Sequence, residues 1–249
     1  KMKNKKLNLG IGKNKMPSSW KFSPDIVKDF DKHIEKSIPK YTDIHKLSTR
    51  ISDFFLTENN CQYLDIGSTT GSLIEKIGLH HNKRKKLNIT GIEIEPHFCK
   101  FSTNRIKKLS LNHNIKFYSQ DILSFFKKST KKYDLITSLF TLQFIKPSKR
   151  AEILKLIYNK LEWGGAFIFF EKVRGSDSRF QDLLNFLLNL EKIDQKFDPV
   201  EIYGKSMSLV GSMEPFTNKG NLELLNNAGF KDIEVIFRFI NFQGYLCIK

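Results

Sequence analysis

Short apolar runs alternate with longer amphipathic stretches through most of the chain. The runs are rich in isoleucine, leucine and aromatic residues and are too short for helices, so they predict buried strands. The strands that we expect are residues 61–66, 87–94, 115–119, 133–138 and 166–170. The amphipathic stretch 148–161 predicts a helix that stops at Trp163-Gly164-Gly165. Strands and helices that alternate in this way predict a doubly wound α/β sheet of parallel strands.

The end of the chain follows a different pattern. A helix over 221–228 stops at Gly229, and two alternating segments, 233–239 and 242–248, follow in close succession. Such a short connection joins antiparallel strands. Five parallel strands and this hairpin predict a seven-stranded, mostly parallel, Rossmann-like sheet, which is the architecture of class I methyltransferases.

Two helical segments lie outside this alternation. Residues 20–56 have apolar residues at helical spacing up to a break at Pro39, and residues 173–215 interrupt the pattern before the hairpin. We expect the first segment to be a lid and the second a helical cover, because an insertion at that point lies over the ligand edge of the sheet. Together with the sheet they form one domain over 20–249, and the basic segment 1–19 is expected to be a disordered tail.

The first predicted strand runs into a turn with two glycines, Asp65-Ile66-Gly67-Ser68-Thr69-Thr70-Gly71. Gly67 allows a sharp turn and a close approach of a ligand to the backbone, and Gly71 opens the following helix. A dinucleotide site would have a further glycine where Thr69 stands. Asp65 would repel a diphosphate but would suit an ammonium group, so the turn favours S-adenosylmethionine (SAM), which has an adenosine end and an amino-acid end. On its own, the motif also fits a plain tight turn.

Further candidate contacts lie where the predicted strands end. Glu93 lies at the carboxyl end of the second strand and has two oxygens that can accept from both ribose hydroxyls, and Glu95 is the competing acid. Asp121 is placed to accept from the adenine amino group, with Ile122 against the ring. Gln143 follows the fourth strand, where the sequence fits either a polar contact to the reactive end of the cofactor or a plain apolar junction.

Composition sets limits on these possibilities. The chain carries 42 Lys and Arg against 26 Asp and Glu, a net charge of +16. Because lysine supplies most of the positive charge beside abundant asparagine, isoleucine and phenylalanine, we attribute the excess to an AT-rich genome, and direct RNA contact is an alternative that is not favoured. No apolar stretch reaches the roughly 18 residues of a membrane span, so no membrane partner is expected. Three cysteines without metal spacing predict a reduced, cytoplasmic setting, and no metal site is expected.

Beyond its fold, the chain resembles the carboxy-SAM synthase family, bacterial enzymes of the tRNA wobble-uridine oxyacetate pathway. The segments that carry the resemblance are 37–41, 140–144, 164–166 leading to 171–172, 205–207 and 239–242. The resemblance implies a homodimer that binds SAM or carboxy-SAM and converts SAM and prephenate to carboxy-SAM and phenylpyruvate. The cofactor contacts that it implies are Tyr41, Gly67, Ser68, Thr69, Glu93, Ile94, Asp121 and Ile122. For Tyr41, simple packing between the two lid helices is the alternative.

Two positions depart from the family pattern. The family arginine before the Ser-Met pair is Lys205 here, in a turn-like setting, and a family asparagine that contacts the cofactor falls on Leu139. A cation near the sulfonium can hold a new carboxylate, so Lys205 is the catalytic candidate, although lysine lacks the bidentate fork of arginine. The alternatives are a conventional methyltransferase acting on a small molecule or RNA, and a non-catalytic SAM- or RNA-binding protein.

Overall fold

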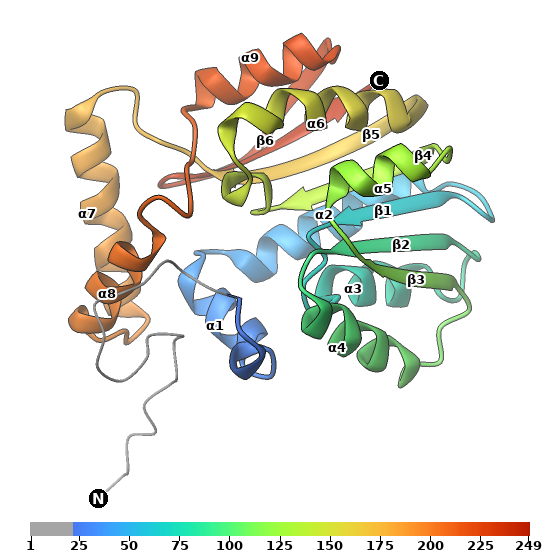
Figure 1. Ribbon diagram of the computed structural model, residues 1–249, viewed down its shortest axis with the longest axis horizontal. Coiled ribbons are helices and arrows are strands. Elements are labelled where there is room, and N and C mark those ends of the chain that lie inside the picture. Colours follow the sequence, from blue (N-terminus) through green and yellow to red (C-terminus); the bar gives the residue numbers. More distant parts are fainter. Residues whose placement is uncertain (1–21) are drawn as a thin grey trace, which may run out of the picture.

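The computed structural model describes residues 22–249, and its centre is a twisted seven-stranded sheet (Figure 1). The strands are β1 (Gln62–Ile66), β2 (Asn88–Glu93), β3 (Asn114–Ser119), β4 (Tyr133–Leu139), β5 (Leu161–Lys172), β6 (Asp232–Phe239) and β7 (Phe242–Ile248). Their order in the sheet is β3-β2-β1-β4-β5-β7-β6. The first five strands pair in parallel, and β7 lies antiparallel between β5 and β6. The predicted doubly wound sheet with its closing hairpin is confirmed, and the predicted tail lies outside the described residues.

Helices cover both faces of the sheet. They are α1 (Phe30–Ser37), α2 (Tyr41–Phe55), α3 (Ser72–His81), α4 (Pro96–Lys107), α5 (Ile122–Lys128), α6 (Pro147–Lys160), α7 (Ser178–Asp194), α8 (Pro199–Leu209) and α9 (Asn218–Ala228), with short 3-10 turns η1 (Pro24–Ile26) and η2 (Leu142–Phe144). One apolar core contains Phe125, Ile153 and Leu225 and joins α5, α6 and α9 to the sheet. A second core contains Ile44 and Ile74 and joins α2 and α3 to the sheet, and a small third one contains Phe30 and Phe98. Strands β1, β2 and β4 and the second half of β5 are buried on both faces and appear in the sequence as continuous apolar runs, whereas the edge strand β3 is largely exposed.

The predicted glycine stop at residues 163–165 is wrong. Helix α6 ends at Lys160, and these residues lie inside β5, where the pairing with β4 shifts its register. Gly164 has a φ of +77°, its N–H donates to the Lys249 carbonyl at 2.8 Å, and the Lys249 N–H donates to the Gly165 carbonyl at 3.0 Å. The two glycines therefore form a bulge that holds Lys249 against β5 instead of ending a helix.

Helices α1, α7 and α8 lie together at one side of the molecule (Figure 1). Helix α1 packs against α4 through Phe30 and Phe98, whose ring centroids are 4.9 Å apart. The Asp198 side chain accepts from the Val200 N–H and caps α8. Lys205 consequently lies inside a helix, and the turn-like setting predicted for it is wrong. None of the helices in residues 22–249 is long and apolar enough to cross a membrane.

Candidate active site

A cavity of about 500 Å³ lies at the carboxyl edge of the parallel strands. Residues at the ends of β1, β2 and β4 form one wall, and residues from α1, α2, α7 and α8 form the other. Open α/β sheets bind ligands at this edge. The predicted site residues that line the cavity are Tyr41, Asp65, Gly67, Ser68, Thr69, Glu93, Ile94, Asp121, Ile122, Leu139, Gln143 and Lys205.

The glycine turn is shaped by packing as well as by access to the cavity. The N–H groups of Gly67 and Ser68 both donate to the Ile92 carbonyl, at 2.9 and 3.0 Å. A Cβ on Gly67, which has a φ of +72°, would lie 2.2 Å from Thr141 Oγ1. Gly71 opens α3 as predicted, but it is absent from the cavity wall, and a Cβ there would instead lie 3.0 Å from the Ser102 side chain. Gly71 therefore shapes the turn without facing the ligand space.

Glu93 holds the turn in place. One carboxylate oxygen accepts from the Thr69 N–H at 3.0 Å and the other from the Glu95 N–H at 2.9 Å. Burial raises the pKa of the Glu93 carboxyl above its ordinary value. Each oxygen keeps a second lone pair, so the carboxylate can still accept two ribose hydroxyls. Glu95 is absent from the cavity wall, which favours Glu93 as the ribose contact.

Asp65 lies deeper, at the end of β1. Its side chain is 4% exposed and accepts from the Thr137 hydroxyl at 2.6 Å. Burial raises the pKa of Asp65 to about 7, and the negative charge of Glu93 adds to this effect while the Thr137 hydrogen bond opposes it. A bound ammonium group would stabilise the ionised carboxylate and lower its pKa again.

The remaining predicted contacts have partners of their own. Asp121 caps α5 by accepting from the Ser124 N–H at 3.0 Å, which leaves its other oxygen for the adenine amino group. The Gln143 Oε1 accepts from the Lys172 N–H at 3.0 Å, so the side chain ties η2 to β5 and offers the cavity only its amide nitrogen. Tyr41 both packs and faces the cavity: its ring centroid is 4.3 Å from that of His45.

Three partly buried lysines face the opposite end of the cavity from the adenosine contacts: Lys172 from β5, Lys192 from α7 and Lys205 from α8. The Lys205 ammonium lies 2.6 Å from His33 Nε2 and donates to the Ser37 hydroxyl at 2.8 Å. Burial lowers the pKa of Lys205 to about 7, with the charges of Lys192 and Lys172 adding to the effect, and burial lowers the pKa of Lys172 to about 8. We refer to these three residues as the lysine end of the cavity.

Sequence reasoning found only one member of the lysine end. Lys172 is the last residue of β5, so its position at the ligand edge could have been found from the strand pattern. Lys192 and His33 lie in helices whose placement over the sheet depends on tertiary packing, and no local motif marks them.

The matched domain and the fold define the class of the protein. A methyltransferase domain model matches residues 57–249. Among solved structures, a SAM-dependent methyltransferase from Aquifex aeolicus superposes with a TM-score of 0.57 at 14% identity, covering 92% of this chain and 99% of that one. Human N-acetylserotonin methyltransferase in complex with SAM gives a TM-score of 0.57 at 18% identity, and this chain spans 56% of its length. The fold is that of the class I methyltransferases.

Sequence relatives narrow the class. The chain is 36% identical to carboxy-S-adenosyl-L-methionine synthase of Staphylococcus epidermidis, over 95% of this chain and 100% of that protein. It is 30% identical to the protein of the same name from Campylobacter lari, over 96% and 98% of the two chains. The chain belongs to the carboxy-SAM synthase family. It is a SAM-dependent transferase, and SAM is its cofactor.

Proposed function

We propose that the protein makes carboxy-SAM from SAM and prephenate and releases phenylpyruvate. The observation that carries this proposal is the lysine end of the cavity. Neither Lys172 nor Lys192 forms an ion pair with any carboxylate in residues 22–249. Withdrawing ammonium groups from water without a counter-charge costs free energy, which an anionic ligand recovers. Prephenate carries two carboxylates and matches this requirement.

The cavity can orient SAM between its two ends. Glu93 and Asp121 are placed for the ribose and the adenine, and Asp65 is placed for the ammonium of the amino-acid part. Bound by these residues, SAM would present its sulfonium between them, since the sulfur lies between the adenosine and amino-acid parts. The carboxyl group that is transferred then comes within reach of the lysine end.

When bound, SAM supplies the methyl carbon that takes up carbon dioxide from prephenate, and the displaced methyl proton leaves with the ring hydroxyl of prephenate as water. Lys205 neutralises the new carboxylate with a point charge, in the place where the family pattern has an arginine. Phe30, Ile34 and Leu188 line the cavity and limit the entry of water. A water-poor cavity keeps carbon dioxide close to the acceptor carbon and strengthens the attraction between Lys205 and the carboxylate.

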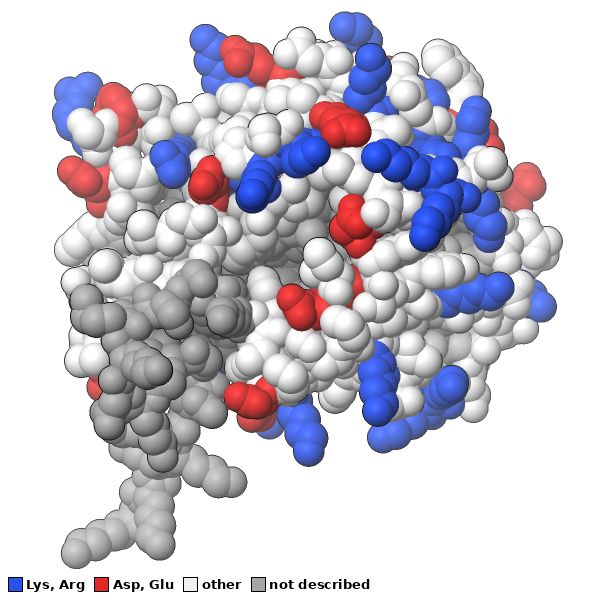
Figure 2. All heavy atoms as spheres, in the orientation of Figure 1, with Lys and Arg blue, Asp and Glu red and all other residues white. Residues whose placement is uncertain are grey.

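Methyl transfer to an anionic small molecule is the second candidate. It is favoured by Leu139, which lines the cavity at the end of β4 and offers no hydrogen-bonding group. RNA as the acceptor has weaker support. Figure 2 shows basic side chains gathered on the α5–α6 side of the visible face, which is the kind of charge that would contact phosphates. We also propose, from the family alone, that the product serves tRNA wobble-uridine modification.

A homodimer is the proposed assembly. Large apolar side chains are exposed along α7 and α8; they are Phe180, Leu183, Phe186, Leu190, Val200, Tyr203 and Met207. Apolar residues in this number on two adjacent helices are typical of a surface that a second subunit covers. The double variant Phe186→Glu, Leu190→Glu should therefore convert a dimer to a monomer in light scattering, while Val235→Glu, at an exposed apolar position on β6, should not. A wild-type monomer at micromolar concentration would contradict the dimer.

The reaction is tested by incubating the purified protein with SAM and prephenate and analysing small molecules by mass spectrometry. Carboxy-SAM and phenylpyruvate should appear in equal amounts. S-adenosylhomocysteine as the product, with prephenate unchanged, would support methyl transfer instead. Unchanged SAM and prephenate would contradict the proposal.

A further inference from the structure

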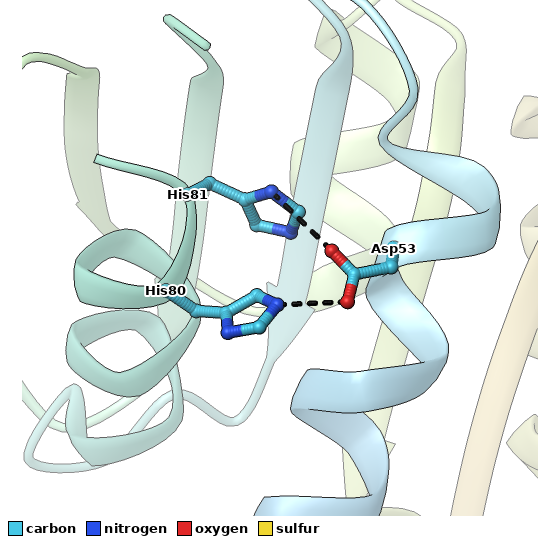
Figure 3. Close-up of side chains that lie close together, drawn as sticks. All are labelled: Asp53, His80 and His81. Carbon is cyan, nitrogen blue, oxygen red and sulfur yellow. Dashed lines mark hydrogen bonds and ion pairs between the residues drawn. The ribbon is translucent and has the colours of Figure 1, made fainter. Parts of the chain in front are cut away.

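A second polar cluster lies at the ends of α2 and α3 that point away from the cavity. Figure 3 shows His80 and His81, from the last turn of α3, pointing toward Asp53 in the last turn of α2. His80 Nε2 lies 2.9 Å from Asp53 Oδ2, and His81 Nδ1 lies 4.0 Å from Asp53 Oδ1. One ligand atom from each of the three residues lies within 4.8 Å of the other two. The sequence alone shows only an adjacent histidine pair, because Asp53 is brought to it by the packing of α2 on α3.

The hydrogen bonds around His81 fix its tautomer. The Ser52 hydroxyl donates its single proton to the Thr49 carbonyl at 2.6 Å, so its oxygen must accept from His81 Nε2, 2.9 Å away. The His81 side chain is fully buried, and a neutral ring that donates from Nε2 has no proton on Nδ1. His81 Nδ1 therefore carries a bare lone pair. It is fully buried, has no hydrogen-bond partner and faces the Asp53 carboxylate.

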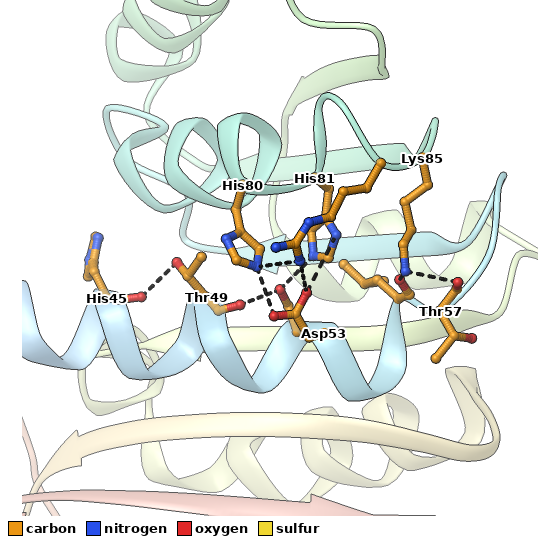
Figure 4. A network of polar contacts seen from close by, with 10 residues as sticks. His45, Thr49, Asp53, Thr57, His80, His81 and Lys85 are labelled. Atoms are coloured by element: carbon orange, nitrogen blue, oxygen red, sulfur yellow. Dashed lines mark hydrogen bonds and ion pairs between the residues drawn. The ribbon is translucent and has the colours of Figure 1, made fainter.

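A lone pair that faces a carboxylate is unfavourable unless a cation lies between the two. The position favours a cation for a second reason, because the C-terminal ends of α2 and α3 both reach it and carry partial negative charge. Figure 4 shows that the surrounding polar contacts, from Thr49 to Lys85, bind the ends of the two helices to each other. In particular, the Lys85 ammonium donates to the Leu56 and Thr57 carbonyls at 2.7 and 2.8 Å.

We propose that Asp53, His80 and His81 form a Zn²⁺ site. Two imidazole nitrogens and one carboxylate oxygen are a ligand set that zinc accepts, with water as the fourth ligand. The bond from His81 Nε2 to Ser52 supplies the outer hydrogen bond that orients ligating histidines. Asp53 and His80 have side chains 36% and 26% exposed, so an ion can enter from solvent. In the metal-bound form His80 would carry its proton on Nδ1 instead of Nε2, so that Nε2 offers a lone pair to the ion, and the side chains would move together by about 1 Å to reach zinc bonding distances.

Arg84 is the competing cation at this position. Its Nη1 donates to Asp53 Oδ1 at 3.0 Å and lies 3.5 Å from His80 Nε2. The Arg84 side chain is 56% exposed, so it can swing into solvent when the ion binds. Zinc bound here would fasten α2 to α3. Since both helices begin at the cavity wall, with Tyr41 and Ser72, the ion would stabilise the back of the SAM site without touching it.

The test uses the full chain, treated with a chelator, desalted and titrated with Zn²⁺ by calorimetry at neutral pH. One ion should bind per chain, and Asp53→Asn and His80→Gln should each weaken binding at least about tenfold. The matched control is Asp43→Asn, an exposed aspartate in the first turn of the same helix, which should bind as the wild type does. Arg84→Gln should bind Zn²⁺ more tightly, because the competing cation is gone. Zn²⁺ should also raise the melting temperature of the wild type and not that of Asp53→Asn.

Three results would overturn the proposal. They are no binding to the wild type, binding that Asp53→Asn and His80→Gln leave unchanged, and binding that Arg84→Gln weakens. The first two would mean that the cluster is an ion-pair network only. Because these readouts are affinity and melting temperature, they do not depend on the reaction proposed for the cavity.

Discussion

The two ends of the cavity are built in different ways. At the adenosine end, Glu93 and Asp121 follow parallel strands, and each carboxylate already accepts from backbone N–H groups. At the lysine end, Lys192 and Lys205 come from α7 and α8, outside the sheet, and the contacts of the Lys205 ammonium include His33 and Ser37. The first end is therefore preformed by the sheet, whereas under the proposed function the second would bind the anionic part of the ligand. The comparison predicts that the two ends respond differently to substitution and to pH.

The largest effect is expected from Lys205→Ala. Carboxy-SAM formation should fall by about 100-fold, because a charge-assisted contact to the transferred carboxylate is lost, while the Kd for SAM should change by less than about threefold. Steady-state kinetics and calorimetry measure the two quantities. Lys205→Arg should retain activity, and Lys155→Ala, at an exposed lysine of α6, serves as the charge control. Equal losses of turnover and SAM affinity would contradict the division of roles.

Glu93→Ala should act on the other end. Its removal takes away acceptors for buried ribose hydroxyls and for the Thr69 N–H, so SAM should bind at least about tenfold more weakly. Glu95→Ala is the matched control, since Glu95 is close in sequence but absent from the cavity wall, and it should leave the Kd within about twofold. The melting temperature of each variant shows whether the turn itself has been disturbed. A larger loss in Glu95→Ala would reverse the assignment of the ribose contact.

The smallest effect, and the sharpest contrast, concerns pH. Asp65 has a pKa raised to about 7, so its carboxylate ionises as pH rises through 7, and SAM with its ammonium should bind more tightly. Lys205 has a pKa lowered to about 7, so it loses its proton over the same range, and prephenate should bind more weakly. Calorimetric titrations between about pH 6 and about pH 8 should show that the affinity for SAM rises with pH while the affinity for prephenate falls. Asp65→Asn should remove the pH dependence of SAM affinity, and Lys205→Met should remove that of prephenate affinity. Affinities for both ligands that change in the same direction with pH in the wild type would contradict the account.

The same two groups make opposite contributions to stability. A raised carboxyl pKa means that the folded state binds more protons than the unfolded state between about 4 and 7, so the contribution of Asp65 to stability falls as pH rises through that window. A lowered lysine pKa means that the unfolded state binds more protons between about 7 and 10.5, so the contribution of Lys205 rises with pH there.

The sheet and the adenosine end could be predicted from the sequence because both depend on local pattern. Buried parallel strands appear as apolar runs, Glu93 is the last residue of β2, and Asp121 lies two residues after the end of β3. The errors have local causes too. A Gly-Gly pair can form a bulge in a strand as well as end a helix, and Gly164 and Gly165 form a bulge in β5. Lys205, next to Gly204, was expected in a turn, but it lies in α8, which Asp198 caps.

What could not be predicted depends on how distant helices pack. Lys192 reaches the cavity only because α7 lies over the sheet edge, and His33 meets Lys205 only because α1 lies beside α8; nothing in their local sequence indicates either position. Asp53 meets His80 and His81 only because α2 packs on α3. Gly71 was expected at the ligand, but it is absent from the cavity wall, and a Cβ there would point at Ser102.

The most direct test of the lysine end compares the affinity of the protein for carboxy-SAM and for SAM. The two ligands differ only by one carboxylate at the methyl carbon, so their ratio of Kd values isolates the contact with Lys205. Wild-type protein should bind carboxy-SAM at least about tenfold more tightly than SAM, which corresponds to roughly 1.4 kcal/mol, and Lys205→Ala should abolish the difference. Equal affinities in the wild type, or a preference for SAM, would contradict the claim that this end of the cavity is built for a carboxylate.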